Sequence, residues 1–290
     1  MKPAPFTYHA PDSVAAALAL KAQLGDEAKF LAGGQSLIPA MNFRVAQPAA
    51  LVDLNRLAEL DFVRVEAGEL RLGALTRQRQ LERHPLVKRH ARLMWEAVPH
   101  IAHPQIRNRG TLGGSLAHAD PAAELPVIVT ALNGRLRALS ARGERWLDAA
   151  QFFLGLFTTA LEPDELLAEV ALPPLPPDSG TAFVEVARRH GDYALLGVAA
   201  VVTVLPAGPQ VRLVYLNAGE GPVVARQAAE AAQGRALTPP VIDEIAAVAA
   251  EHDLQPIGSL HASPEYQRHL ARVLTRRALV TALERAVEAP

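Results

Sequence analysis

The sequence predicts an α+β protein of two or three domains, and three observations support this prediction. Short apolar runs typical of strands alternate with helical patterns through the first part of the chain. A segment with four prolines, Leu172–Gly180 (LPPLPPDSG), marks a domain boundary. After it, three strand patterns are followed by three helical patterns, which indicates an α+β domain whose sheet is covered on one face. The length of 290 residues allows each domain its own core.

The first predicted elements lead to a short glycine turn. Pro11-Asp12-Ser13 is typical of a helix cap, and the helix that begins at Val14 is expected to stop at Gly25. Four strands are expected next: Ala28–Ala32, Ala49–Leu54, Phe62–Glu66 and Glu69–Gly73. The first of these strands runs directly into the pair Gly33-Gly34, so it would deliver that turn to a ligand.

The middle of the chain combines helices with a long polar loop. The loop His100–Pro121 is rich in Gly, Asn, His and Arg and lacks apolar periodicity, and long ordered loops of this kind are usually functional. Before it we expect a helix over Arg77–Arg83, capped by Thr76, and another over Leu86–Val98. After it we expect a helix Ala122–Leu132 capped by Asp120-Pro121, a strand Arg135–Leu139, and a strand–helix–strand passage through Trp146–Phe153 and Glu165–Leu172.

The part that follows the prolines is predicted to place strands before helices. The expected strands are Thr181–Arg188, Leu195–Leu205 and Val211–Leu216. The expected helices are Pro222–Gln233, Pro239–Glu251 and Pro264–Val287.

Composition excludes several classes of function. The net charge is −1 at pH 7, so the chain has no broad basic field for nucleic acid or an anionic membrane. It contains no cysteine, which excludes a disulfide and a thiolate-held metal or iron–sulfur cluster in this chain; any such cluster must lie in a partner. The start of the chain lacks the cationic and apolar segments of a signal peptide, and no long apolar run follows, so we expect a cytoplasmic protein.

Two glycine turns are the strongest sign of a ligand site. Ala32-Gly33-Gly34-Gln35-Ser36 and Thr111-Leu112-Gly113-Gly114-Ser115 each place two residues without Cβ beside hydroxyl groups. Backbone N–H groups can approach an anion closely at such positions, and the hydroxyls can donate as well. The two turns are 75 residues apart, counted from Ser36 to Thr111. Together they predict one elongated ligand with a central diphosphate, held from two sides.

Other chemical motifs are missing or incomplete. The chain has no G-x-G-x-x-G after a strand and no G-x-x-x-x-G-K-[ST], which argues against Rossmann and P-loop folds. Ser115 lies in no G-x-S-x-G elbow, which argues against a hydrolase. A loose set of His and carboxylate side chains lacks the spacing of a helical metal motif: His100, His103, His118, Asp120 and Glu124.

Four residues have both a functional and an ordinary interpretation. Arg107 and Arg109 are either donors to a phosphate or solvated loop cations. Glu124 either accepts hydrogen bonds from sugar hydroxyls or lies on a helix surface. Tyr193, which ends the polar turn Arg188–Tyr193, either packs on a planar ligand or only completes the turn.

Four segments, taken in order, resemble one family over nearly the whole chain. They are AGGQSLIPAMNFR, LVDLNRL, HPQIRNRGTLGGSLAHADPAAELP and ARRHGDYAL. On these motifs the chain resembles the FAD-binding medium subunit of the molybdenum hydroxylases, which include carbon monoxide dehydrogenase, xanthine dehydrogenase and aldehyde dehydrogenase types. The resemblance implies a two-lobed FAD-binding domain, vanillyl-alcohol-oxidase-like and not Rossmann, with lobes at 1–55 and 56–175. It also implies a C-terminal α+β domain at 178–290 with an antiparallel sheet and helices.

The resemblance implies FAD as the cofactor and assigns its binding residues by motif. The diphosphate would lie between the first turn, Leu31, Ala32, Gly33, Gly34, Gln35, Ser36 and Leu37, and the second turn, Thr111, Gly113, Gly114 and Ser115. Also implied are Glu124 on the ribose, Ile101 and Ala102 near the flavin ring or adenine, Leu167 as a packing contact, and Tyr193 over the isoalloxazine. No catalytic acid or base is assigned, because the chemistry belongs to the flavin. We also expect Gly113→Val to abolish FAD retention without unfolding the chain.

The implied function is electron transfer within a three-subunit enzyme. A large subunit would oxidise substrate at a molybdenum cofactor, a small subunit would relay electrons through two [2Fe–2S] clusters, and this chain would pass them to an external acceptor. The assembly would be a dimer of heterotrimers. Some relatives place a lysine in the strand before the Arg-Arg turn, where this chain has Val184 and Glu185. Two alternatives stay open: a self-sufficient flavin-dependent oxidoreductase of the same fold, and an assembly module without a cofactor.

Overall fold

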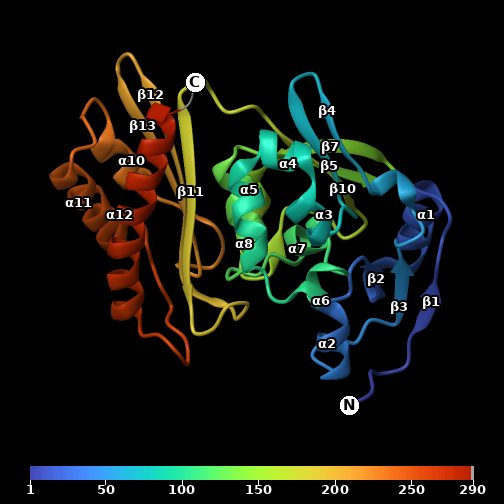
Figure 1. The fold of residues 1–290 in the computed structure, drawn as a ribbon. Coiled ribbons are helices and arrows are strands. Elements are labelled where there is room, and N and C mark those ends of the chain that lie inside the picture. The colour runs from blue at the N-terminus through green and yellow to red at the C-terminus, as the bar shows by residue number, and fades with distance from the viewer. Residues whose placement is uncertain (289–290) are drawn as a thin grey trace.

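A computed structural model describes residues 1–288 (Figure 1). The buried apolar residues of this part of the chain form three cores. The first core belongs to the N-terminal lobe, the second to the middle lobe, and the third lies beneath the C-terminal helices. The second core also contains Ala199 and Val214 of the C-terminal sheet, so the apolar interior is continuous across the proline-rich segment.

The N-terminal lobe is a three-stranded parallel sheet with the order β1–β3–β2. Its elements are β1 Thr7–His9, α1 Val14–Leu24, η1 Gly25–Glu27, β2 Ala28–Leu31, α2 Leu37–Asn42, β3 Ala50–Asp53 and η2 Ala58–Leu60. The Ser13 hydroxyl accepts from the Ala16 N–H and Gly25 has φ +63°, which confirms both predicted ends of the first helix. The sequence pattern indicates neither β1 nor α2, because each is short and β1 depends on pairing with a distant strand.

The middle lobe is built on a five-stranded antiparallel sheet with the order β4–β5–β10–β6–β7. Its strands are β4 Val63–Glu66, β5 Glu69–Gly73, β6 Arg135–Ser140, β7 Gly143–Asp148 and β10 Leu166–Leu172, with a ribbon of β8 Phe153–Gly155 and β9 Thr158–Thr159. Its helices are α3 Gln78–Arg83, α4 Pro85–His90, α5 Arg92–Ala97, η3 Val98–His100, α6 Pro104–Arg107, α7 Leu112–His118, α8 Glu124–Ala131 and α9 Ala149–Phe152.

Three helix predictions in this lobe are wrong in detail. The helix expected over Leu86–Val98 is two helices, because the backbone leaves the helical region at Ala91, where φ is −142° and ψ is 57°. The helix expected over Arg77–Arg83 is confirmed as α3, which begins one residue later, but the predicted cap is wrong: Arg77 is the cap residue, and the Thr76 hydroxyl donates to the Phe62 carbonyl instead. Helix α8 begins only at Glu124, because Asp120 accepts from the Ala122 N–H in a turn that precedes the helix.

The long polar loop His100–Pro121 is also more regular than its sequence suggests, because it contains α6 and α7. Glycine is a poor helix former, yet Gly113 and Gly114 lie in α7. The Thr111 side chain caps this helix by accepting from the Gly114 N–H. The Thr111 cap and the packing of α7 against Ala74 and Thr76 therefore stabilise this helix despite its two glycines.

The C-terminal domain is a four-stranded antiparallel sheet between two helical layers (Figure 1). Its elements are β11 Ser179–Ala187, β12 Ala194–Leu205, β13 Gly208–Leu216, β14 Val223–Val224, α10 Arg226–Ala232, α11 Pro239–Val248, the π turn η4 Ala249–Asp253 and α12 Pro264–Glu288. Helices α10 and α12 pack on one face, whereas α5 and α8 of the middle lobe pack on the other. The sheet expected to be covered on one face is therefore covered on both.

Two details of the C-terminal helices differ from the prediction. The helix expected from Pro222 begins at Arg226, because Val223–Val224 pairs with β13 as strand β14. The helix expected to Glu251 ends at Val248 and continues as the π turn. The predicted strands and the long last helix are confirmed. Within residues 1–288, no helix is long and apolar enough to cross a lipid bilayer.

Candidate functional site

The two glycine turns lie against each other, although 75 residues separate them in sequence. A Cβ placed on Gly33 would lie 2.4 Å from the Arg109 carbonyl oxygen and 2.9 Å from the Gly110 Cα. A Cβ on Gly114 would lie 3.5 Å from the Cβ of Ala32. The turn that follows β2 therefore packs directly on the start of α7.

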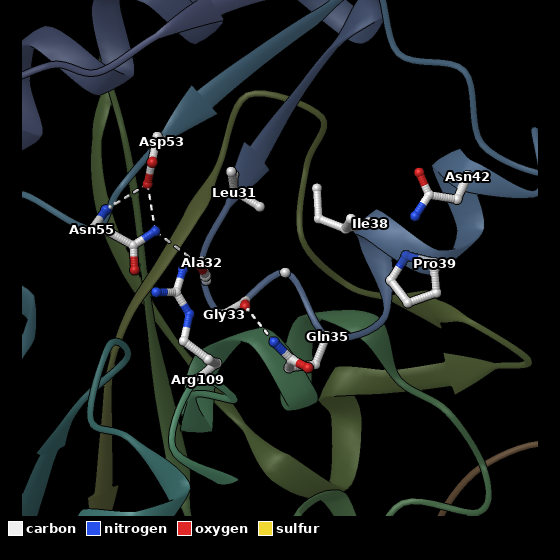
Figure 2. A pocket seen from close by; sticks show the side chains of 11 residues that line it. Leu31, Ala32, Gly33, Gln35, Ile38, Pro39, Asn42, Asp53, Asn55 and Arg109 are labelled. Carbon is white, nitrogen blue, oxygen red and sulfur yellow. Dashed lines mark hydrogen bonds between the residues drawn. The ribbon is translucent and has the colours of Figure 1, made fainter. Parts of the chain in front are cut away.

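A cavity of about 410 Å³ opens beside the first turn (Figure 2). Strand β2 supplies the turn, the end of β3 supplies Asp53 and Asn55, and α2 supplies one wall. The residues that line the cavity are Leu31, Ala32, Gly33, Gly34, Gln35, Ile38, Pro39, Asn42, Asp53, Asn55 and Arg109. Five of the residues predicted by motif therefore line one cavity.

This cavity has the chemistry of an anion site. Within residues 1–288, the backbone N–H groups of Gly33, Gly34 and Gln35 donate to no protein acceptor. Arg109, which the sequence left as either a phosphate donor or a solvated cation, lines this cavity. Figure 2 shows its guanidinium on the side of Ala32 and Asn55. Three free N–H donors beside a cation suit a phosphate or diphosphate group.

Asp53 gives the same cavity an acceptor of hydrogen bonds. Its carboxylate accepts from the Tyr8 hydroxyl at 2.5 Å and from the Asn55 N–H at 2.8 Å, and the Asn55 amide donates to the Ala32 carbonyl at 2.9 Å. Burial raises the pKa of Asp53, but these hydrogen bonds outweigh burial and hold it below its ordinary value. A fixed carboxylate next to a phosphate site suits the hydroxyl groups of a ribose.

The second glycine turn does not offer its backbone N–H groups to an anion as expected. Leu112 donates to the Thr76 carbonyl at 2.9 Å, Gly113 to the Ala74 carbonyl at 2.8 Å, and Gly114 to the Thr111 hydroxyl at 3.1 Å. A Cβ on Gly113 would lie 2.5 Å from the Cβ of Ala74. The glycines of this turn thus allow α7 to approach β5, and the Gly113→Val expectation is revised in the Discussion.

Arg107 is neither a phosphate donor nor a solvated cation. Its side chain is buried, and it donates to the Ile101 carbonyl at 2.8 Å and to the Ala102 carbonyl at 3.1 Å. Its Nε also pairs with Glu82 at 3.2 Å. Both interpretations that the sequence allowed are therefore wrong, and Arg107 organises the backbone of a neighbouring loop.

A second group of predicted residues meets where the middle lobe contacts the C-terminal sheet. Ala102 lies against Gly191, whose Cβ would be 2.6 Å from the Ala102 carbonyl oxygen. Tyr193 follows in the same turn with 73% of its surface exposed. Partial burial of its hydroxyl, followed by the carboxyl groups of Asp120 and Glu124, raises the pKa of Tyr193. The aromatic ring therefore stands free beside two acidic side chains.

Glu124 is buried, so its interpretation as a surface carboxylate is wrong. Only 7% of it is exposed, and burial, with smaller contributions from Glu185 and Asp120, raises its pKa to about 8. Glu185 pairs through Oε1 with His100 Nδ1 at 3.3 Å, and its buried Oε2 has no partner within the described residues. A buried acceptor without a donor fits a site whose donor is a bound ligand.

Leu167, which was predicted as a packing contact of the cofactor, is buried in the apolar core of the middle lobe with 4% of its surface exposed. Five cavity-lining residues were not predicted as site residues: Ile38, Pro39, Asn42, Asp53 and Asn55. A signal for two of them existed, because LVDLN places Asp53 at the end of a strand and Asn55 just after it, and this strand pairs in parallel with β2. The α2 wall has no such signal.

Comparisons with known proteins define the class of this fold and site. Residues 4–175 match the family model described as "FAD binding domain in molybdopterin dehydrogenase". Residues 181–282 match the model described as "CO dehydrogenase flavoprotein C-terminal domain". The chain is 42% identical over 288 residues to the 6-hydroxypseudooxynicotine dehydrogenase complex subunit alpha of Paenarthrobacter nicotinovorans, covering 99% of this chain and 97% of the relative.

Solved structures agree with this match. The carbon monoxide dehydrogenase of Hydrogenophaga pseudoflava that lacks the Mo-pyranopterin moiety superposes with a TM-score of 0.95 at 36% identity, covering 98% of this chain and 99% of that chain. Quinoline 2-oxidoreductase from Pseudomonas putida 86 superposes with a TM-score of 0.93 at 34% identity, covering 99% of both chains. The protein is thus a flavoprotein subunit of an oxidoreductase.

The chain belongs to the family of FAD-binding medium subunits of molybdenum hydroxylase complexes. This confirms the resemblance, the fold class and the assignment of FAD as the cofactor of this oxidoreductase subunit. The donor set of the cavity fits FAD, because the free N–H groups and Arg109 suit its diphosphate and Asp53 suits a ribose.

Proposed function

We propose that this chain accepts electrons from the [2Fe–2S] clusters of a small subunit and passes them through FAD to an external acceptor. When bound, FAD supplies chemistry that exchanges electrons singly or in pairs. The observation that supports the proposal best is the cavity in which three free backbone N–H groups and Arg109 stand beside the first glycine turn. The residues of this chain bind and orient the cofactor, and none of them is assigned as an acid or base.

We propose that two regions of the chain bind different parts of FAD. The diphosphate and one ribose would be held at the cavity, by the N–H groups of the first turn, Arg109 and Asp53. The flavin ring would lie where the middle lobe meets the C-terminal domain, beside Ile101, Ala102 and Tyr193. Ser36, Leu37, Thr111, Gly113, Gly114, Ser115 and Leu167 stay in the proposal as residues that shape or support the site. Glu124 would accept from a ribose or ribityl hydroxyl.

The proposed partners follow from what this chain lacks. It has no cysteine to ligate an iron–sulfur cluster, so the clusters belong to another chain. A relative is named as the subunit of a dehydrogenase complex, which supports an assembly with other chains. We propose an iron–sulfur small subunit and a molybdenum-binding large subunit, assembled as a dimer of heterotrimers. Cytoplasmic location stays a prediction.

The alternative is a self-sufficient flavin-dependent oxidoreductase of the same fold. The relatives' names favour a subunit, and substrate choice would then belong to the molybdenum-binding chain. Purified alone, a self-sufficient enzyme would turn over with an electron donor and acceptor. A subunit would bind FAD but would need the reduced iron–sulfur partner before its flavin bleaches.

The first experiment measures FAD binding by the purified chain and by Arg109→Ala. Bound oxidised FAD gives absorption bands near about 370 and 450 nm. Loss of one charged donor to the diphosphate is expected to raise the Kd for FAD about 10- to 100-fold. The control is Arg268→Ala, which removes an exposed arginine from α12 in the C-terminal domain and should leave the Kd unchanged.

Two results would overturn the proposal. One is a chain that takes up no FAD, either alone or when co-expressed with its iron–sulfur and molybdenum partners. The other is FAD that binds but stays oxidised when the clusters of the partner are reduced. An Arg109→Ala chain with wild-type affinity would move the diphosphate away from the cavity.

A further inference from the structure

Arg107 gathers the backbone of one loop around a single buried cation. Its Nη1 donates to the carbonyls of Ile101, Ala102 and Pro99, at 2.8, 3.1 and 3.4 Å. Its Nε donates to Glu82 at 3.2 Å, and Glu82 is also held by Arg79 at 2.7 Å. Because Arg107 is only 5% exposed, these carbonyls and the Glu82 carboxylate take the place of its hydration.

The loop that Arg107 holds has an unusual backbone. Ala102 has φ +42°, a left-handed conformation that is unfavourable for an alanine. Such a conformation persists only where the surroundings fix it. The Arg107 guanidinium is one such support, because it binds the carbonyl of this residue and of the residue before it.

The Ala102 carbonyl is one point where the C-terminal domain touches this loop, and His100 is another, through Glu185 and the ring of His190. A Cβ on Gly191 would lie 2.6 Å from the Ala102 oxygen and 3.0 Å from its carbon. Gly191 has φ +87° and belongs to the turn between β11 and β12. Glycine is therefore required twice here, once for the conformation and once for the close approach.

Tyr193 lies two residues after Gly191, and few contacts hold its side chain in place. Its side chain is 73% exposed and makes no side-chain hydrogen bond within the described residues. The turn before it is closed by the Asp192 N–H, which donates to the Arg189 carbonyl at 3.1 Å. The place of the ring relative to the FAD-binding domain therefore depends on how the turn 188–193 sits on the loop, and its tightest approach is that of Gly191 to Ala102.

We propose that Arg107 is a positioning residue for Tyr193. It holds the Ala102 carbonyl against Gly191, and this contact fixes the turn 188–193 relative to the FAD-binding domain. The inference rests on the proposed function, in which Tyr193 contacts the flavin ring. Within the described residues, the Arg107 side chain forms no hydrogen bond with a residue that lines the diphosphate cavity. It therefore acts through the loop.

The test compares two glycine substitutions that share the same backbone strain. Gly191→Ala adds a Cβ at φ +87° that collides with the Ala102 carbonyl. Gly68→Ala adds a Cβ at φ +83° with nothing within 4 Å, so it is the matched control. Arg107→Lys removes the planar fork that serves several carbonyls while keeping the charge beside Glu82. If Arg107→Lys fails to fold, Gly191→Ala carries the test.

The first readout needs no cofactor. The chain has four tyrosines, so labelling with 3-fluorotyrosine gives four ¹⁹F signals. The signal that is missing from Tyr193→Phe is that of Tyr193. We expect the Tyr193 signal to shift in Gly191→Ala and in Arg107→Lys, and to stay in place in Gly68→Ala. An unchanged Tyr193 signal in Gly191→Ala, or in a folded Arg107→Lys, would overturn the inference, whatever the chain does with FAD.

The second readout uses bound FAD, whose fluorescence a stacked tyrosine quenches. Gly191→Ala is expected to lose this quenching and to raise the Kd for FAD about 2- to 10-fold, the effect of losing one aromatic contact. In a Tyr193→Ala background, Gly191→Ala should change the Kd and fluorescence no further, which a merely structural role would not produce. Additive effects would overturn the inference. A shifted ¹⁹F signal in a chain that never binds FAD would instead reject the proposed function alone.

Discussion

Glu124 is a buried residue whose ionisation makes the stability of this protein depend on pH. It begins helix α8, and the ionisable groups that face it are Asp120, Glu185 and Tyr193. None of these three groups is a cation, and a backbone hydrogen bond offsets only part of the cost of burying a charge there. Burial, followed by the charge of Glu185, raises its pKa to about 8 from an ordinary value of 4.5.

This shift predicts that the FAD-free chain loses stability as pH rises. Between about pH 4.5 and pH 8 the folded chain keeps a proton on Glu124 that the unfolded chain releases, so a higher pH favours unfolding. Across that range the free energy of unfolding should fall by roughly 3–5 kcal/mol on account of this group. Glu124→Gln, which stays neutral, should remove that fall, as measured by urea denaturation at pH 5, 6, 7 and 8.5.

The control for this prediction is Glu230→Gln, which removes an exposed carboxylate on α10. Its pH profile should follow that of the wild type. A Glu124→Gln profile parallel to the wild type at every pH would mean that Glu124 is ionised in the folded chain and that its surroundings supply a positive charge.

At the scale of elements, the approach of α7 to the end of β5 decides the geometry of both glycine turns. Gly113 donates its N–H to the Ala74 carbonyl and leaves no room for a side chain. The expectation that Gly113→Val releases FAD without unfolding is therefore revised, because the added atoms collide with Ala74 of the protein itself. Even Gly113→Ala is expected to lower the free energy of unfolding of the FAD-free chain, by about 1–3 kcal/mol.

Thermal or urea denaturation without FAD measures this effect. The control is Gly221→Ala, whose Cβ would lie 3.8 Å from Phe153, at ordinary contact distance, and which should change stability little. If Gly113→Ala matched the control in stability and lost only FAD affinity, α7 would be shifting to accommodate the methyl group and the glycine would serve the cofactor directly.

At the scale of the whole molecule, the domains suggested by the sequence share one interior. The core of the middle lobe includes Ala199 and Val214 of the C-terminal sheet, and Arg285 of α12 donates to Glu96 of α5 at 2.8 Å and to the Thr181 carbonyl. Because a domain that exposes part of its core is unstable alone, we expect the middle lobe and C-terminal domain to unfold together.

Two probes test this cooperativity. Both tryptophans, Trp95 and Trp146, lie in the middle lobe, so their fluorescence follows that lobe, whereas far-UV circular dichroism follows all helices. The two urea transitions should coincide in the wild type, and in Arg285→Ala they should shift together to lower urea. A fluorescence transition separated from the dichroism transition would show that the domains are independent.

Local sequence predicted most long elements of this fold. Ser13 and Gly25 bound the first helix because capping and left-handed backbone are local properties. The alternating and apolar runs of β11, β12 and β13 have the period of a strand and are long enough to be unambiguous. Short elements such as β1, α2 and α7 were missed, because pairing and packing with distant residues stabilise them.

The sequence by itself determined the family, the cofactor and the first glycine turn, because those depend on residue types held in a fixed local order. Only the tertiary structure decided the roles of the charged residues. Arg107 and Arg109 are two positions apart, yet one binds carbonyls inside the protein and the other lines the cavity. Glu124 is buried because α8 packs on a sheet from the end of the chain. Burial and partner choice depend on residues far apart in sequence, and no local pattern contains them.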